Sequence, residues 1–586
     1  MVRRALIMVE YSLSFSAAKK NYIFISVTCT AVSKITIFSL PVWAPGSYMI
    51  RDYSRHIVNK HVTVNGEEKA LQVANKNSWY VNCNPEDVIL FSYTIYAWDW
   101  SVRACILEED FAHIAGSAAF VRVQTQEDCA HIVRWKKHDD EWKCATAMNA
   151  HREVNTWMAD NYDELIDQPM LMGRITSFSW KIDKTAYCMS VTPTALINPE
   201  PLIRDLSKII MTQKEIFGSL PKVVDKYHFL VIAADKLMGG LEHRRSASLI
   251  CSHKNFQSTI TNNLDSNYID FLSLCSHEHF HIWWAKFFKP KEFITYDLDR
   301  EQYTSLLWLF EGLTSYYGDL VLVRSGLLPI ERYLKSIANT IQSVESYAGY
   351  NQQTVAESSF DAWIKYYRPT GNRLNSQISY YDKGNLIALY TDCFLMLESN
   401  GRHNLDSVLR DLWNHHRNDS CCQISESGWY NFIRNTTSID IEPAVSNLVH
   451  GYDYVEWEVI FRGMGINYQA TPTKENVPHW GATFTSDQNL IVDMVIDNSS
   501  AMTAGISSGD RIIAIDQLEC TKQSLSEITS HVSVGQKSTV HFVRQGLLRT
   551  GTITWLPSPI KFASRKIEIS NRDSKYVNMW LKSSIG

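Results

Sequence analysis

The residues with the most direct capacity for chemistry form a His-Glu-x-x-His pattern at 277–281, inside an apolar segment. Four residues along an α-helix turn the chain by about 400°, so His277 and His281 share one face and can bind one metal ion. Two neutral imidazoles and one carboxylate suit zinc and leave a fourth position for water, whose proton Glu278 is placed to accept. His279 lies about 200° from His277, and we expect it to pack rather than to bind the metal.

The third metal ligand must come from elsewhere, and Glu311 is the preferred candidate. It interrupts the apolar run 306–313, and an ionised carboxylate buried there is costly unless a cation or strong donors compensate it. A metal ion would compensate it; the alternative is a structural carboxylate bonded to the backbone or to an arginine. The other downstream acidic residues have polar neighbours and are comfortable as solvated charges: Glu292, Asp297, Asp299 and Glu301.

Two further motifs fit the same cleft. Gly239 and Gly240 follow a strand-like segment and let a backbone approach a bound peptide, and Glu242 offers an anionic partner for an ammonium group. Tyr381 opens another apolar helix, and its phenol, near a zinc ion, could donate to the oxyanion of a tetrahedral intermediate. For a tyrosine the alternative is simple packing.

The elements that must position these residues fall into three zones. Residues 1 to about 185 alternate short β-branched segments with turn clusters, which indicates a β-rich part. From about 201 to 451 apolar residues recur at helical spacing, in the segments 202–217, 268–288, 303–324, 330–347 and 385–398. After about 463 short strands return around one helix expected at 524–532.

Composition narrows the class of protein. The 586 residues exceed the ~100–200 of one typical domain, so several cores are expected. With 57 Lys and Arg against 62 Asp and Glu, and no dense basic run, we expect no nucleic-acid partner.

The first apolar run, 5–9, is short for a signal peptide and no run is long enough to span a membrane. Twelve scattered cysteines without a Cys-x-x-Cys pair predict reduced thiols and a cytoplasmic protein.

Taken together, the motifs resemble the PDZ-containing glycyl aminopeptidase family, which belongs to the gluzincin zinc peptidases. The resemblance rests on the His-Glu-x-x-His pattern and on several other segments in the same order. It covers nearly the whole chain. The segments are LPVWAPGSYMIRDY at 40–53, AWDWSVR at 97–103, YDELID at 162–167, GGLEH at 239–243, WLFEGLTSYY at 308–317 and YDKG at 381–384.

The resemblance implies a multidomain α+β protein. It places an N-terminal β-rich domain at 1–185, a thermolysin-like, mostly helical catalytic domain at 186–462, a PDZ-like domain at 463–560 and a C-terminal tail at 561–586. It implies one zinc ion per chain, held by His277, His281 and Glu311, with Glu278 as general base. It also implies that Tyr381 stabilises the oxyanion, and that Glu242, beside Gly239 and Gly240, holds the free amino terminus of the substrate.

The chain departs from the family pattern after the first motif. HIWWAKFFKP stands at 281–290, where the family usually shows Trp-Asn and then Lys-Arg. The metal ligands are unchanged. We therefore expect this departure to affect the shape of the substrate pocket and the preference for amino-terminal glycine.

The part of the chain after about residue 463 also resembles a PDZ domain, because 500–515 combines a small-residue turn, a Gly-Asp pair and an apolar strand. PDZ grooves take a chain end as an added strand, so a peptide or a segment of the same chain is the expected partner. The alternative is a scaffold unit that binds nothing, since no carboxylate-binding loop is clear around 480–482.

We therefore predict a zinc aminopeptidase acting on peptides with a free N-terminus and favouring small residues such as Gly or Ala. One alternative is a zinc endopeptidase that recruits substrates through its PDZ-like unit. Another is a non-catalytic PDZ adaptor with a structural metal. The predicted open coordination argues against the adaptor, because structural zinc sites usually have four protein ligands.

Overall fold

The computed structural model describes residues 8–15, 21–137, 139–193, 196–261, 264–474, 476–486 and 489–582. The chain divides into two compact units. The first unit contains Met1–Gln302, Tyr317–Leu327 and Leu412–Ile424, and the second contains Tyr303–Tyr316, Leu328–Asp411 and Ser425–Gly586. Within the described residues, no helix combines the length and the apolar character needed to cross a membrane.

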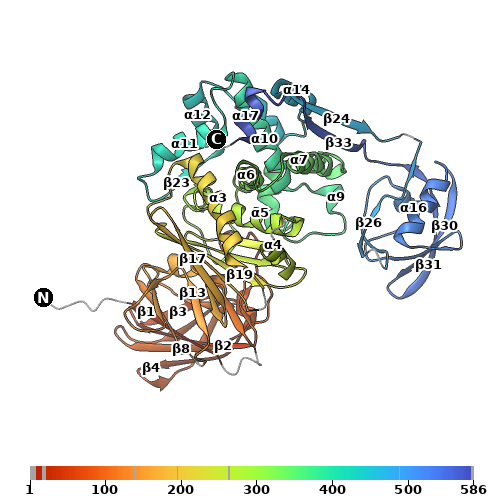
Figure 1. The fold of residues 1–586 in the computed structure, drawn as a ribbon. Coiled ribbons are helices and arrows are strands. Elements are labelled where there is room, and N and C mark those ends of the chain that lie inside the picture. The colour runs from red at the N-terminus through yellow and green to blue at the C-terminus, as the bar shows by residue number, and fades with distance from the viewer. Residues whose placement is uncertain are drawn as a thin grey trace. The chain divides into compact units, whose positions relative to one another are not determined.

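The N-terminal part of the first unit is built from β-sheets, as the sequence predicts (Figure 1). Its largest sheet has eight strands in the order β14-β15-β12-β1-β2-β8-β4-β5. Alternate residues of β1, from Val9 to Phe15, are buried, so one face of this sheet covers a core. The bounds are β1 (Met8–Phe15), β2 (Tyr22–Thr30), β4 (Ile57–Val64), β5 (Glu67–Glu68), β8 (Val88–Tyr96), β12 (Ala130–Trp135), β14 (Asn149–Ala150) and β15 (Thr156–Ala159).

Two four-stranded sheets and two short helices complete this part. One sheet has the order β13-β16-β10-β9 and the other β11-β3-β7-β6. The elements are β3 (Ile35–Ser39), β6 (Gln72–Asn75), β7 (Ser78–Asn82), β9 (Ile106–Leu107), β10 (Phe111–Ile114), α1 (Gly116–Ala119), β11 (Arg122–Val123), β13 (Lys143–Thr146), α2 (Tyr162–Ile166) and β16 (Met170–Gly173).

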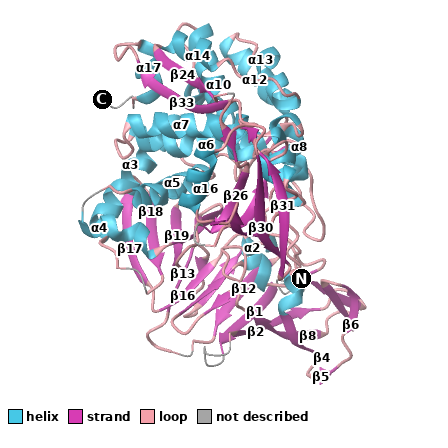
Figure 2. Cartoon of the chain, turned by 90° about the vertical axis from the view of Figure 1, so that its right-hand side faces the viewer, coloured by secondary structure: helices cyan, strands magenta, loops and turns pink. Residues whose placement is uncertain are grey.

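A five-stranded sheet carries the catalytic part of the first unit, in the order β17-β18-β19-β21-β20. The pairs β18–β19 and β19–β21 are parallel, whereas the edge strand β20 runs antiparallel to β21. Helix α5 contacts α3, β20 and β21, and Figure 2 shows α3 and α5 beside the strands. The bounds are β17 (Thr176–Ile182), β18 (Thr185–Val191), α3 (Pro199–Phe217), β19 (Lys226–Ala233), β20 (Gly239–Glu242), β21 (Ser246–Cys251), α4 (Gln257–Thr261) and α5 (Ser266–Phe280).

Helix α6 (Leu307–Arg324) packs closely on α5. Ser273 donates a hydrogen bond to Asp319 Oδ1 at 2.6 Å, and the rings of Phe280 and Tyr317 stack with their centroids 4.9 Å apart. A Cβ added at Gly318 would lie 3.7 Å from the Cβ of His277, so the two helices approach through a glycine at this point.

The second unit is mostly helical next to a small sheet. A Cβ added at Gly312 would lie 2.4 Å from the backbone of Gly384, so this glycine pair brings α6 and α10 into backbone contact. The helices are α7 (Ile330–Glu345), α8 (Val355–Phe360), α9 (Arg373–Ser376), α10 (Tyr380–Glu398), α12 (Glu426–Thr437), α13 (Glu442–His450) and α14 (Trp457–Met464); α11 (Leu405–His416) continues into the first unit.

A sheet with the strand order β26-β27-β28-β30-β31 follows, with a core of its own that includes Trp480 and Trp555. Its helix α16 (Lys522–His531) lies where the sequence predicts one. The remaining elements are β26 (Ala482–Ser486), β27 (Ile491–Val495), α15 (Ser500–Thr503), β28 (Arg511–Ile515), β29 (Leu518–Glu519), β30 (Lys537–Arg544) and β31 (Leu547–Thr554), with β25 (Pro478–His479) pairing with β32 (Leu556–Pro557).

The described part of the segment expected as a C-terminal tail is ordered into a strand and a helix. Strand β33 (Phe562–Ile569) pairs antiparallel with β24 (Ile466–Pro472). Helix α17 (Lys575–Leu581) buries Trp580 completely, and the Trp580 indole donates a hydrogen bond to the Tyr316 hydroxyl at 2.9 Å. Val577, Trp580 and Leu581 recur at helical spacing and are the local signal for this helix.

Candidate metal centre and active site

Two histidines and one glutamate converge at the C-terminal end of α5. Ligand atoms of His277, His281 and Glu311 all lie within 4.8 Å of one another, and the Nε2 atoms of the two histidines are 3.1 Å apart. Glu311 lies in α6 and is 2% exposed. The structure therefore brings together the three residues that the sequence selects as metal ligands.

The hydrogen bonds around His281 suit metal binding. Its Nδ1 lies 2.8 Å from the backbone carbonyl oxygen of Trp284. A carbonyl can only accept, so Nδ1 carries the hydrogen and the Nε2 lone pair is left for a cation. Two imidazoles and one buried carboxylate are the donor set that zinc prefers, and the residues present fit that metal.

The other histidine of the motif packs in the interior, as its helical position predicts. His279 is fully buried, and its Nδ1 lies 2.6 Å from Gln213 Oε1. Burial lowers the pKa of His279 to about 3, so the ring stays neutral. Two of the alternative acidic ligands are in ion pairs elsewhere, Asp299 with Arg122 and Asp297 with Arg300.

Glu278 lies directly against the edge strand β20. Its side chain is 5% exposed, and a Cβ added at Gly240 would lie 2.1 Å from Glu278 Oε1. Only glycine leaves room for this carboxylate. Arg103 Nη2 donates to the carbonyl oxygen of Gly240 at 2.8 Å and holds the strand in place. Gly239 is different, because the nearest atom to an added Cβ there is Arg103 Nη1 at 3.9 Å.

Glu242 ends the same strand and lies close to the proposed base. Ligand atoms of Glu242, Glu278 and His281 lie within 4.8 Å of one another, and Glu242 is 5% exposed. A Cβ added at Gly46 would lie 2.5 Å from Glu242 Oε1. The backbone of Gly46, which has φ +93, therefore covers one side of this carboxylate. Gly46 lies in the family segment 40–53, and nothing local in the sequence indicates that it contacts Glu242.

A buried chain of charges supports Glu242, and sequence reasoning missed it. Lys286 Nζ lies 3.9 Å from Glu242 Oε1 and 3.3 Å from Asp167 Oδ1. Burial opposes the charge on Asp167, but Lys286 and His243 outweigh it and hold the pKa of Asp167 well below its usual range. Burial also opposes the charge on Lys286, and Asp167 and Glu242 raise its pKa above the ordinary value. Asp167 lies in the family segment 162–167 and Lys286 in the divergent segment 281–290, and nothing local in the sequence indicates that they meet.

Tyr381 lies in the first turn of α10, near Glu311. Burial raises the pKa of Tyr381, and the charge of Glu311 raises it further. The Tyr381 hydroxyl lies 3.5 Å from the hydroxyl of Tyr367. The phenol therefore keeps its proton at neutral pH and can act as a hydrogen-bond donor.

Comparisons with known proteins agree on one family. The M61 glycyl aminopeptidase model matches residues 270–387, and the peptidase M61 N-terminal domain model matches residues 10–174. An aminopeptidase N family protein from Idiomarina loihiensis has a solved structure with a TM-score of 0.92 and 32% identity, covering 98% of this chain and 100% of that chain.

More distant structures include an M1 zinc metallopeptidase from Deinococcus radiodurans. Its TM-score is 0.48 at 11% identity, covering 77% of this chain and 95% of that chain. No curated protein matches the sequence significantly. Because the match to the Idiomarina protein spans nearly all of this chain and the whole of that one, and both M61 models fit, the chain belongs to the M61 glycyl aminopeptidase family and is a zinc aminopeptidase.

Proposed function

We propose that this enzyme removes one residue at a time from peptides with a free amino terminus, with one zinc ion per chain. The observation that carries the proposal is the position of Glu242, a buried carboxylate within 4.8 Å of ligand atoms of Glu278 and His281. A carboxylate so placed pairs with an ammonium group. Anchoring the amine beside the base restricts cleavage to the first peptide bond.

His277, His281 and Glu311 would hold the zinc ion. Zinc in this position supplies a Lewis acid that polarises the substrate carbonyl and acidifies water. Glu278 accepts the proton of the attacking water and returns it to the leaving amine. Tyr381, which stays protonated because burial and Glu311 raise its pKa, donates a hydrogen bond to the developing oxyanion.

We also propose a preference for small amino-terminal residues such as Gly or Ala. The backbone of Gly46 lies against the Glu242 carboxylate, which limits the room beside the anchored amine. The Trp284 side chain, at a position where the family usually has Asn, is fully buried. Initial rates with glycyl, alanyl and leucyl anilides test this preference. Equal kcat/KM for all three would refute it.

The decisive experiment compares Glu242→Gln with the wild type on free and N-acetylated peptides, with and without a chelator. The variant keeps the shape of the side chain and loses its charge, so KM for free-amine substrates should rise about tenfold or more. Glu109→Gln, which changes an exposed carboxylate, is the matched control. Efficient cleavage of acetylated peptides would instead favour the endopeptidase reading.

We further propose that the sheet β26-β27-β28-β30-β31 is PDZ-like and binds a peptide chain end. Edge strand β26 pairs only with β27 among the described residues, so its other edge is available for an added strand. Trp480 Nε1 and Thr483 Oγ1, beside this edge, are buried and have no hydrogen-bond partner among the described residues. Anisotropy of a labelled peptide, with a free carboxylate or a C-terminal amide, tests this with the full chain. Equal affinity for the two forms would contradict it.

We propose a cytoplasmic location. All twelve cysteines are described, and each is a free thiol. Disulfides persist in oxidising compartments and are rare in the cytoplasm, so this state supports a reducing environment. Fractionation of the native protein would test the proposal, and recovery from an extracytoplasmic fraction would refute it.

A further inference from the structure

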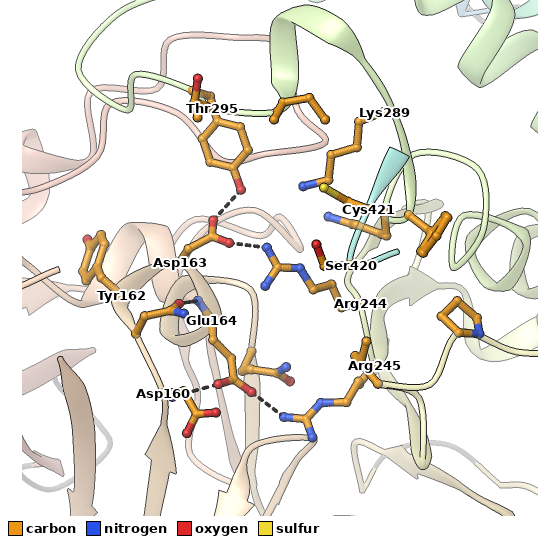
Figure 3. Close-up of a pocket in the computed structure, with 18 of the residues that line it drawn as sticks. Asp160, Tyr162, Asp163, Glu164, Arg244, Arg245, Lys289, Thr295, Ser420 and Cys421 are labelled. Carbon is orange, nitrogen blue, oxygen red and sulfur yellow. Dashed lines mark hydrogen bonds and ion pairs between the residues drawn. The ribbon is translucent and has the colours of Figure 1, made fainter. Parts of the chain in front are cut away.

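A large cavity in the first unit lies apart from the metal centre. Its volume is about 1010 Å³, and it is bounded by residues 160–168 of the N-terminal part and by the segment 282–298 of the catalytic part (Figure 3). None of His277, Glu278 and Glu242 lines it. Lys286 is shared, because it lines the cavity and also contacts Glu242.

Most charges on the cavity wall are already neutralised. Arg244 pairs with Asp163, which also accepts a hydrogen bond from the Tyr296 hydroxyl, and Arg245 pairs with Glu164 at 2.7 Å (Figure 3). On the same wall Arg122 pairs with Asp299 and Glu127.

Lys289 is the exception among these cations. Its Nζ takes part in no ion pair and no hydrogen bond with the residues that the structure describes, and it lies 5.7 Å from the centroid of the Tyr296 ring. Burial lowers the pKa of Lys289, and the neighbouring charge of Arg244 lowers it further, while the charge of Asp163 opposes this shift only in part. A half-buried ammonium next to a guanidinium is stabilised by an anion between them.

The remaining acidic side chains do not fill that position. Asp128 and Asp160 line the cavity from the N-terminal part, and the backbone N–H of Asp160 donates to Glu164 Oε2. In Figure 3 Asp160 lies near Glu164, away from Lys289, whereas Ser420 and Cys421 lie close to Lys289.

We propose that this cavity binds a small oxyanion between the ammonium of Lys289 and the guanidinium of Arg244. Ser420, which also lines the cavity and lies close to Lys289 in Figure 3, brings a hydroxyl donor to the same site. A tetrahedral inorganic anion and an organic carboxylate share the required chemistry, because each presents several acceptor oxygens to cationic donors.

The site is connected to the amine anchor by a continuous set of contacts. The backbone N–H of Arg244 donates to Asp167 Oδ2 at 2.9 Å, and Asp167 contacts Lys286, which contacts Glu242. An anion near Arg244 weakens the pull of Arg244 on Asp167, so Asp167 attracts Lys286 more strongly away from Glu242. A bound anion should therefore favour the substrate ammonium at Glu242, a consequence that rests on the proposed function.

Calorimetric titration of the zinc-loaded full-length enzyme with sulfate, at constant ionic strength set by chloride, tests the site. We expect saturable binding of one sulfate per chain in the low millimolar range or tighter. Lys289→Met should bind about tenfold more weakly or worse, since a charge-assisted hydrogen bond is lost. Lys289→Arg should retain binding. Lys291→Met is the matched control, because Lys291 is exposed, does not line the cavity and lies two residues along the chain.

A parallel titration with succinate shows whether an organic carboxylate takes the same site. Absence of saturable binding by both anions, or unchanged binding in Lys289→Met, would overturn the proposal. Sulfate should also lower KM for a glycyl anilide about twofold, with little change in kcat. If sulfate binds through Lys289 and KM does not change, the anion site stands and its coupling to Glu242 through Asp167 and Lys286 falls, whereas Glu242→Gln tests the amine anchor itself.

Discussion

At the scale of single residues, the centre combines groups whose roles differ because their surroundings differ. Glu311 is nearly inaccessible and lies within 4.8 Å of the ligand atoms of two imidazoles, so a bound cation would compensate its charge. Glu278 lies one residue from a ligand and against the Gly240 backbone. Glu242 forms an ion pair with Lys286. We therefore propose that these three carboxylates act as metal ligand, proton acceptor and amine anchor, respectively.

The ligand role of Glu311 predicts a specific loss of zinc. Glu311→Gln should retain the shape of the side chain and bind zinc about a hundredfold more weakly, since an anionic ligand becomes neutral. Glu301→Gln, which changes an acidic residue of the same connecting segment, should keep wild-type zinc content. Metal analysis after dialysis against a weak chelator measures both. Equal zinc retention in the two variants would rule out Glu311 as a ligand.

The proton-transfer role of Glu278 predicts the opposite pattern. Glu278→Gln should keep its zinc and lose about 10²–10⁴-fold in kcat, because the general base is gone while the ligands remain. Zinc content and anilide turnover are measured on the same preparation. A variant with wild-type kcat would refute the assignment.

At the scale of elements, two glycines on β20 and α6 set the geometry of the site. Gly240 lets the edge strand approach Glu278, and Gly318 lets α6 lie against His277. Each close approach places a functional side chain through the backbone of a neighbouring element. Side-chain chemistry alone does not identify such positions, because the glycine itself takes no part in the reaction.

The strand β20 offers a matched pair of substitutions for this argument. Gly240→Ala should displace the Glu278 carboxylate and reduce kcat about a hundredfold, since small misplacements of a catalytic group are costly. Gly239→Ala should be nearly neutral, because an added Cβ there has its nearest neighbour at 3.9 Å. Steady-state kinetics and zinc content of both variants check this. A similar kcat in the two variants would contradict the steric argument.

At the scale of the whole molecule, the N-terminal part contributes to the site as well as to the fold. Gly46 covers Glu242, Arg103 holds Gly240, and Asp167 contacts Lys286. All three come from the β-rich half of the first unit. The β-rich sheets would therefore complete the proposed amine site, and we expect their stability to affect activity directly.

Buried histidines in these sheets predict loss of stability in acid. His131 is inaccessible, and burial lowers its pKa to about 4, below the value of about 6.5 in an unfolded chain. Between these values the unfolded state binds more protons, so stability falls as pH decreases from about 6.5 to 4, by about 3 kcal/mol for this group. His113 behaves in the same way.

Thermal unfolding at pH 7 and pH 4.5 measures this effect. His131→Gln removes the titrating group, so its melting temperature should fall less between the two pH values than that of the wild type. His253→Gln, at an exposed position, should show the wild-type difference. An identical pH difference in His131→Gln would exclude His131 as a contributor.

Family, class of enzyme and the β-rich and helical parts were all predictable from the sequence, because they depend on local patterns. The spacing of His277 and His281 fixes one helical face, and the apolar run around Glu311 marks a buried carboxylate. The motifs, in order, identify the family that the comparisons confirm. The ordered strand and helix within 562–581 were not expected.

Only the tertiary structure decided what surrounds the amine anchor. Gly46, Asp167, Glu242 and Lys286 are far apart along the chain, and nothing in their local spacing shows that they meet. The contact between Lys286 and Glu242 depends on how a loop, a strand edge and a helix end pack against each other. Long-range packing of this kind leaves no periodic trace in the sequence, whereas the two histidines are placed by the pitch of a single helix.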